Sequence, residues 1–178
     1  MRLSRRNLLG LALAGSVATI AKPSWAALTD AGARRLAFYN LHTGESVTAT
    51  YWADGHYIPD QLRDVDRILR DFRTGDVTAI DPKLLDLLHV LRRNLNSNEP
   101  FHVISGYRSP RTNEMLRHEG GGVAAHSLHT VGQAIDIRVP GRQLADVRRA
   151  AMTLQSGGVG YYPKSDFVHV DTGRVRFW

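Results

Sequence analysis

One stretch decides the predicted fold of this chain: SLHTVGQAIDIRV, residues 127–139. It begins with polar residues, passes through a glycine at position 132 and continues as a strand over 133–139. Along that strand the side chains alternate, so Ile135 and Ile137 fall on one face and Asp136 falls on the other. We expect the apolar face to pack on helices, which turns Asp136 toward a polar cleft.

The spacing of His129 and Asp136 indicates a turn between them. On one continuous helix, two residues seven positions apart would lie about 10.5 Å apart along the axis. His and Asp are common metal ligands, and if both residues bound one zinc ion their donor atoms would lie only about 3–3.5 Å apart, since bonds to the metal are about 2.0–2.2 Å long. A turn at Gly132 that feeds the strand would fold Asp136 back beside His129.

The elements around this stretch mix strands with helices. A hairpin is predicted from two strands around a turn at 42–46, and a helix is expected to begin at Ser109-Pro110, where serine is a good N-cap and proline a good first residue. The order predicts an α+β fold, with a small, mostly antiparallel sheet flanked by helices. The predicted strands are 36–41, 47–52, 101–105, 133–139, 157–163 and 167–171, and the predicted helices are 59–73, 81–95, 109–118 and 142–155.

The composition excludes several kinds of catalytic and metal site. The chain has 178 residues, about one domain's worth, and no cysteine, which excludes thiol catalysis, zinc–thiolate sites and iron–sulfur clusters. Its formal net charge is +6, but four of the basic residues lie in the first 26 positions, which hold no acidic residue. The other basic residues alternate with acidic ones, as in RDVDR at 63–67. This dispersed pattern does not predict nucleic-acid binding.

Residues 1–26 have the pattern of an export signal. Arg5 and Arg6 precede an apolar stretch of about 14 residues, too short to span a bilayer, and a small-x-small cleavage pattern ends at Ala26. Paired arginines are typical of the twin-arginine type of signal, and Lys22 fits that route. We expect the twin-arginine translocase to export the folded protein to the periplasm, with residues 27–178 as the mature domain. The alternative is an uncleaved signal that anchors the protein to the membrane.

Three of the eight histidines lie in glycine-broken, polar stretches next to strands, namely His126, His129 and His169. In the segment DFVHVD, residues 166–171, the valines alternate with His169, so this histidine shares a face with polar groups. His129, Asp136 and His169 would complete a site of two histidines and one carboxylate, and three protein ligands with a fourth position for water is the arrangement of catalytic zinc. His126 lies beside this pattern and is expected to be structural.

Three motifs resemble those of the D-Ala-D-Ala metallopeptidase family, peptidase family M15, whose group includes lysostaphin-like and hedgehog-like domains. The pattern SxHxxGxAxD at 127–136 resembles its zinc motif, SGYRS at 105–109 with Asn113 downstream resembles its upstream motif, and Asp166-x-x-His169 resembles its closing acid-x-x-His. All three have the family's order and spacing across 101–171, and the chain after residue 26 is similar to the murein endopeptidase K branch.

The resemblance implies a hedgehog/DD-peptidase-like zinc fold for residues 27–178. It implies one Zn²⁺ per chain, held by His129, Asp136 and His169, with Asp166 as catalytic base and Arg108 as a cationic stabiliser of the substrate carbonyl. Several relatives close with His-x-His, whereas this chain has histidine at 169 and Asp171 two positions on. That departure leaves Asp171 as an alternative third ligand, with the histidine as the catalytic residue.

The implied activity is zinc-dependent hydrolysis of cross-link peptide bonds in peptidoglycan. One alternative is a D,D- or L,D-carboxypeptidase or dipeptidase that trims stem peptides, with Arg108 binding a substrate carboxylate. A second alternative is a zinc-stabilised module that binds the cell wall without cutting it. Asp166 favours an enzyme, because a binding module needs metal ligands but no general base.

Overall fold

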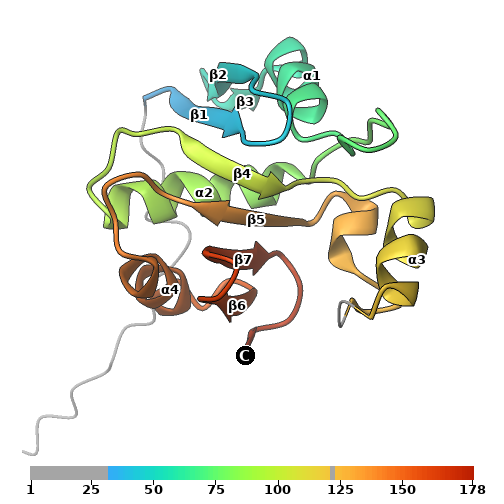
Figure 1. Ribbon diagram of the computed structural model, residues 1–178. Coiled ribbons are helices and arrows are strands. Elements are labelled where there is room, and N and C mark those ends of the chain that lie inside the picture. The colour runs from blue at the N-terminus through green and yellow to red at the C-terminus, as the bar shows by residue number, and fades with distance from the viewer. Residues whose placement is uncertain (1–31, 121–122) are drawn as a thin grey trace, which may run out of the picture. The chain divides into compact units, whose positions relative to one another are not determined.

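The computed structural model describes residues 32–120 and 123–178, and its centre is a sheet of eight strands (Figure 1). The order across the sheet is β3-β2-β1-β4-β5-β7-β6-β8. β1 pairs with β4, and β6 with β8, in parallel, and the other neighbours are antiparallel, so the predicted α+β fold with a mostly antiparallel sheet is confirmed. The strands are β1 Arg34–Asn40, β2 Ser46–Ala53, β3 His56–Tyr57, β4 Phe101–Ser105, β5 Ala134–Arg138, β6 Gly158–Tyr162, β7 Phe167–Asp171 and β8 Arg176–Phe177.

Two of the described helices begin at a side-chain cap, and the cap at Ser109 was predicted from the sequence. The Ser109 side chain accepts a hydrogen bond from the Thr112 N–H at the start of α3, and Asp81 caps α2 through the Lys83 N–H. The bounds are α1 Pro59–Ile68, α2 Pro82–Asn94, α3 Pro110–His118, α4 Leu144–Thr153 and a 3-10 turn, η2, Leu128–Val131. In the part of the chain that is described, no helix combines the length and the apolarity needed to cross a membrane.

The prediction that the first helix reaches residue 73 was wrong, since α1 ends at Ile68. Partners elsewhere in the fold take up the carbonyl groups that would have continued the helix. Asn40 donates its side-chain N–H to the Ile68 carbonyl at 3.0 Å, and the Tyr107 N–H donates to the Leu69 carbonyl at 2.7 Å. The chain then turns at Asp71, which ties it to the beginning of α3.

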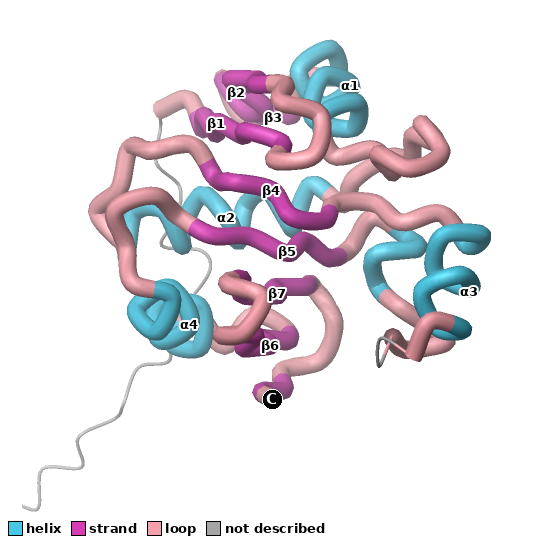
Figure 2. Tube along the Cα trace, in the orientation of Figure 1, coloured by secondary structure: helices cyan, strands magenta, loops and turns pink. Residues whose placement is uncertain are grey.

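Helices α1, α2 and α4 contribute to one apolar core against a single face of the sheet (Figure 1). Ile135 and Ile137 of β5 are fully buried in that core, as are Val168 and Val170 of β7. The polar residues that alternate with them therefore project from the other face. α3 and η2 lie together at one end of β4 and β5 (Figure 2), and a hydrogen bond from the Arg108 N–H to the His129 carbonyl joins the two segments.

Two predictions fall wholly or partly outside the described residues. The predicted signal at 1–26 lies wholly outside them. The domain predicted at 27–178 is described at 32–120 and 123–178.

Candidate metal centre

The turn at Gly132 brings His129 back to Asp136, as the sequence predicts. Gly132 has a φ of +68°, and a Cβ at this position would lie 2.4 Å from the Ala79 carbonyl oxygen. Only glycine adopts that conformation at that distance from a neighbouring backbone. The chain then enters β5, where Asp136 is paired directly with His169 of the antiparallel strand β7.

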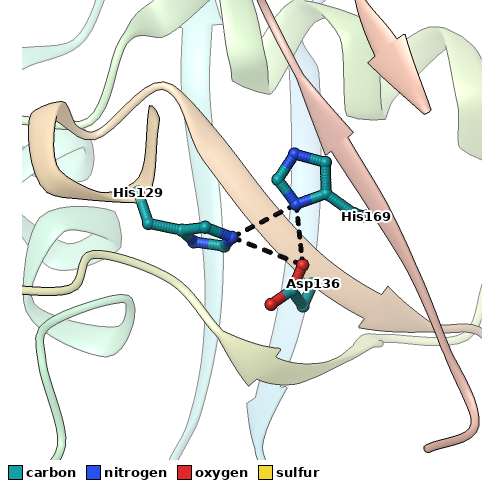
Figure 3. Close-up of side chains that lie close together, drawn as sticks. All are labelled: His129, Asp136 and His169. Atoms are coloured by element: carbon teal, nitrogen blue, oxygen red, sulfur yellow. Dashed lines mark hydrogen bonds and ion pairs between the residues drawn. The ribbon is translucent and has the colours of Figure 1, made fainter. Parts of the chain in front are cut away.

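Three donor atoms from these residues converge (Figure 3). Asp136 Oδ1 lies 2.9 Å from His169 Nδ1 and 3.3 Å from His129 Nε2, and the two histidine nitrogens are 3.2 Å apart. All three side chains are buried. These separations match the roughly 3–3.5 Å expected between two ligands of one zinc ion, so the donor set fits the metal that the resemblance implies.

Hydrogen bonds on the outer side of each ring fix which nitrogen faces the cluster. His129 Nδ1 donates to the Gly106 carbonyl at 2.7 Å, and His169 Nε2 donates to Asp171 Oδ2 at 2.9 Å. The two inward nitrogens therefore offer lone pairs, and Asp136 adds a carboxylate oxygen. Three acceptors at these distances need a positive charge among them, and histidines held in this way from behind are typical of metal sites.

The protonation equilibria of the cluster agree with that need for positive charge. Burial opposes ionisation of Asp136, but the neighbouring His129 and His169 outweigh it and hold the pKa of the carboxyl well below its usual range. Burial also opposes protonation of His169, yet its hydrogen bonds to Asp136 and Asp171 raise its pKa to about 8.

Asp171 lies behind His169 rather than among the inward-facing donors. It is fully buried, and its two carboxylate oxygens accept hydrogen bonds from His169, Arg176 and the Gly158 and Gly173 N–H groups. Burial opposes its ionisation, but the bonds from His169 and Arg176 prevail and lower its pKa well below the usual range. This geometry favours His169 over Asp171 as the third member of the cluster.

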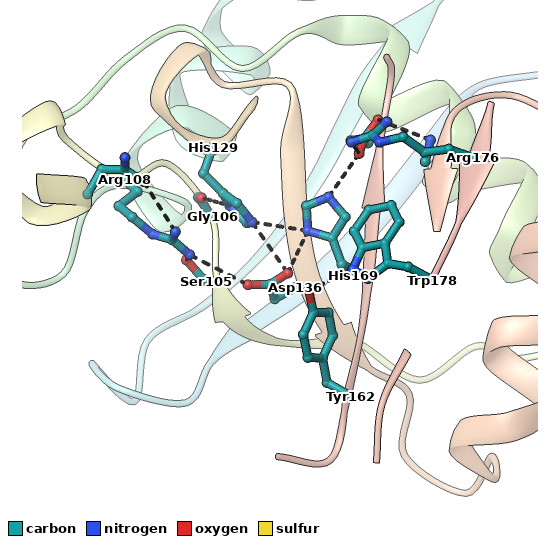
Figure 4. A network of polar contacts seen from close by, with 12 residues as sticks. Ser105, Gly106, Arg108, His129, Asp136, Tyr162, His169, Arg176 and Trp178 are labelled. Atoms are coloured by element: carbon teal, nitrogen blue, oxygen red, sulfur yellow. Dashed lines mark hydrogen bonds and ion pairs between the residues drawn. The ribbon is translucent and has the colours of Figure 1, made fainter. Parts of the chain in front are cut away.

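Arg108 comes from the loop after β4 and reaches the same cluster (Figure 4). Its Nη2 lies 3.8 Å from Asp136 Oδ2, and it makes long hydrogen bonds of 3.5 Å to Asn113 and Ser105. Its side chain is only 12% exposed, and its buried Nε has no partner. The guanidinium is thus weakly engaged by protein groups and can bind an oxygen of a ligand.

The structure does not place the Asp166 carboxylate with these groups. Asp166 Oδ2 accepts a hydrogen bond from Arg138 Nη1 at 2.6 Å, and its side chain is 59% exposed. The residue has a positive φ of 53° at the turn before β7, and the next residue, Phe167, lines the cavity over the cluster.

A cavity of about 460 Å³ lies over the His129–Asp136–His169 cluster. Arg108 and His126 are part of its lining, and His126 is exposed. The other wall is aromatic: Tyr162 and Phe167 stack with ring centroids 4.5 Å apart, and Trp178 Nε1 donates to the Tyr162 hydroxyl at 2.7 Å.

Sequence reasoning missed two contributors to this site, Arg176 and Trp178. The Trp178 ring lies 5.3 Å from the His169 ring, and the Arg176 guanidinium lies 4.9 Å from the Trp178 ring. Sequence reasoning also missed the strand β8, which continues the sheet beyond β6. The glycine at position 160 was the feature of the sequence that could have indicated a bulky side chain against β6, because a Cβ at Gly160 would lie 2.7 Å from the Trp178 ring.

An α+β sheet with a buried His–Asp–His cluster beneath a cavity defines the class that the motifs had indicated, the M15 peptidases. Residues 29–178 match the family described as peptidoglycan L,D-endopeptidase MepK. The chain therefore belongs to this family, it is a peptidase, and the resemblance inferred from the motifs is confirmed.

Individual relatives agree with the family match. The chain is 43% identical to the peptidoglycan L,D-endopeptidase MepK of Escherichia coli strain K12 over 98% of this chain and 97% of the relative. The protein of the same description from Shigella flexneri matches with the same identity and coverage. A probable peptidoglycan L,D-endopeptidase MepK from Haemophilus influenzae is 43% identical over 82% of this chain and 78% of the relative.

Proposed function

We propose that this protein is a zinc-dependent endopeptidase that hydrolyses cross-link peptide bonds of peptidoglycan in the periplasm. The observation that carries the proposal is the convergence of His129 Nε2, His169 Nδ1 and Asp136 Oδ1 within 3.3 Å of one another beneath a cavity. The relatives named as peptidoglycan endopeptidases support the choice of polymer and of an internal bond.

His129, Asp136 and His169 would hold one Zn²⁺ per chain. When bound at such a site, zinc supplies Lewis acidity, which polarises a substrate carbonyl and makes water a stronger acid. The hydrogen bonds from His129 to Gly106 and from His169 to Asp171 hold both rings in the orientation that points one nitrogen of each at the metal position.

Arg108 stabilises the negative charge that develops on the carbonyl oxygen during attack by water. Its guanidinium makes only long hydrogen bonds to Asn113 and Ser105 and lies close to Asp136, so it needs no large rearrangement to donate to that oxygen. The same donors would bind a substrate carboxylate, which is the role that the carboxypeptidase alternative requires.

Asp166 is the proposed general base: it accepts a proton from the attacking water and returns it to the leaving amine. For this role its carboxylate must turn from Arg138 toward the cavity. The turn costs little, because an ion pair between side chains 38% and 59% exposed is worth at most about 1 kcal/mol.

Digestion of purified peptidoglycan tests the proposal. We expect the wild-type protein to convert cross-linked muropeptide dimers into monomers, identified by mass spectrometry, and we expect a chelator to stop the conversion. Release of terminal residues alone would establish the carboxypeptidase alternative. Binding to the polymer without any cleavage would establish the cell-wall-binding module.

Export through the twin-arginine translocase is the second part of the proposal, and it rests on Arg5 and Arg6. Residues 1–26 fused to a reporter that is exported only when folded should deliver it to the periplasm, with cleavage near Ala26. Replacing both arginines by lysine should block delivery. Unchanged delivery would assign the signal to the general secretory route, and an uncleaved product at the membrane would indicate an anchor.

A further inference from the structure

The orientation of the His169 ring depends on Asp171, which lies on the side of the ring away from the metal cluster. His169 and Asp171 stand two residues apart on β7 and therefore share a face of the strand. The bond from His169 Nε2 to Asp171 Oδ2, at 2.9 Å, orients the ring so that Nδ1 points at Asp136. A displacement of the Asp171 carboxylate would release the ring from that orientation.

Asp171 is in turn held by a two-pronged ion pair. Arg176 Nη1 donates to Oδ1 at 3.0 Å and Nη2 donates to Oδ2 at 2.7 Å, so the planar guanidinium matches both carboxylate oxygens. Arg176 is the cation bonded to this fully buried carboxylate, whose other partners are His169 and the Gly158 and Gly173 N–H groups. A buried carboxylate without a cation is costly, and His169 is neutral when it binds a metal, so Arg176 is needed to hold the charge of Asp171 in place.

The sequence of β6 leaves room for this ion pair. A Cβ on Gly158 would lie 2.4 Å from Arg176 Nη1 and 2.5 Å from Asp171 Oδ2. The Arg176 guanidinium is also held from outside, since it lies over the Trp178 ring, and its Nη1 donates to the Arg174 carbonyl at 3.1 Å. These contacts fix the guanidinium on several sides.

We propose that Arg176 is a positioning residue for the metal centre, acting through Asp171 to fix the orientation of His169. The inference rests on the proposed metal site and adds to it a residue 40 positions beyond the zinc motif at 127–136. Arg176 lines the cavity over the cluster, but its guanidinium is bonded to Asp171 and is not one of the three inward-facing donors, so its effect should appear first in metal affinity.

The test measures zinc affinity of the full chain by competition with a chromophoric chelator, without reference to activity. Arg176→Gln should weaken zinc binding by at least about tenfold, within the range typical when a partner behind a metal ligand is removed. Arg176→Lys keeps the charge but not the two-pronged geometry, and should recover part of that loss. Arg174→Gln, an exposed arginine in the same segment, is the matched control and should bind zinc as the wild type does.

A second readout distinguishes positioning from a general loss of structure. Cobalt in place of zinc gives visible absorption that depends on the ligands, and Arg176→Lys should alter that spectrum while the far-UV circular dichroism of the metal-free protein stays unchanged. Wild-type zinc affinity and an unaltered cobalt spectrum in both Arg176 variants would overturn the proposal, and so would an equal loss in Arg174→Gln. If the wild-type chain itself binds no zinc, the proposed metal site fails, and the positioning role fails with it.

Discussion

The resemblance implies that Asp166 is the catalytic base, whereas in the structure its carboxylate is bonded to Arg138 and does not lie with the metal cluster. A matched pair of substitutions tests which role the carboxylate has. The first is Asp166→Asn, and the second is Arg138→Gln, which removes the partner that holds the carboxylate at 2.6 Å. Both break the same exposed ion pair, which is worth about 0.2–1 kcal/mol. Each variant should therefore keep its fold, with a melting temperature within about 4 °C of the wild type.

The two variants should differ sharply in turnover. Loss of a general base typically costs about 10²–10⁴-fold, which is about 3–5 kcal/mol at 1.36 kcal/mol per factor of ten. Asp166→Asn should lose at least a hundredfold, because the amide keeps the shape of the side chain but accepts no proton. Arg138→Gln should stay close to the wild-type rate, because it frees the carboxylate to turn toward the cavity.

The assay follows cleavage of a purified cross-linked muropeptide dimer by chromatography, with zinc content measured on the same samples. Zinc content should be equal in the wild type and both variants. The assignment of the base is refuted if Asp166→Asn keeps zinc and turns over within tenfold of the wild type. Equal losses in both variants would show that the ion pair matters only for structure, and loss of zinc in Asp166→Asn would make the carboxylate a ligand.

Three further predictions concern the metal, a buried carboxylate and the cavity wall. Chelation should abolish hydrolysis, and added zinc should restore it. In thermal unfolding, zinc at 100 times its dissociation constant should stabilise the wild-type fold by about 2.7 kcal/mol, whereas it should not stabilise the His129→Ala variant. Burial raises the pKa of Asp71, but hydrogen bonds from Thr112 and Ser109 outweigh it and the net pKa is lowered, so Asp71→Asn should cost about 1–3 kcal/mol at neutral pH. In denaturant titrations this cost should shrink as the pH falls from about 4, where Asp71 of the unfolded chain takes up a proton, through the lower pKa that the carboxyl has in the folded protein; a cost that does not change with pH would contradict the ionised role. Gly160→Ala should destabilise the protein by about 1–3 kcal/mol, because the Cβ would lie 2.7 Å from the Trp178 ring, whereas Gly32→Ala, with nothing within 4 Å of its Cβ, should be neutral in the same melts.

Local patterns were enough to predict the elements that carry the site. Alternation along 133–139 gave Asp136 its direction, and the glycine at 132 gave the turn that returns to His129, because both depend only on the geometry of a few adjacent residues. The serine–proline pair at 109–110 likewise fixed the start of α3, where the capping bond forms as expected.

Contacts between residues distant in the sequence were beyond such patterns. α1 ends early because Asn40, 28 positions away, captures its last carbonyl. The Asp166 side chain pairs with Arg138, also 28 positions away, and no local spacing indicates which basic residue an exposed carboxylate will meet. Arg176 lies only five positions from Asp171, yet the run Arg174-Val175-Arg176 gave no sign that one of its two guanidinium groups would be bonded to Asp171 and lie over the Trp178 ring.

The register between β5 and β7 connects the apolar core to the metal cluster. Asp136 meets His169 only because Ile135 is paired with Val170, and Ile137 with Val168. A slip by one residue would turn His169 into the core and expose Val168 and Val170, both now fully buried. Exposing two valines would cost about 3 kcal/mol or more, before the cost of burying an imidazole without partners. The hydrophobic pattern of β7 thus sets the distance between two proposed metal ligands. Substitutions of Val168 or Val170 should therefore disturb metal binding, although both side chains are buried in the core on the other face of the strand.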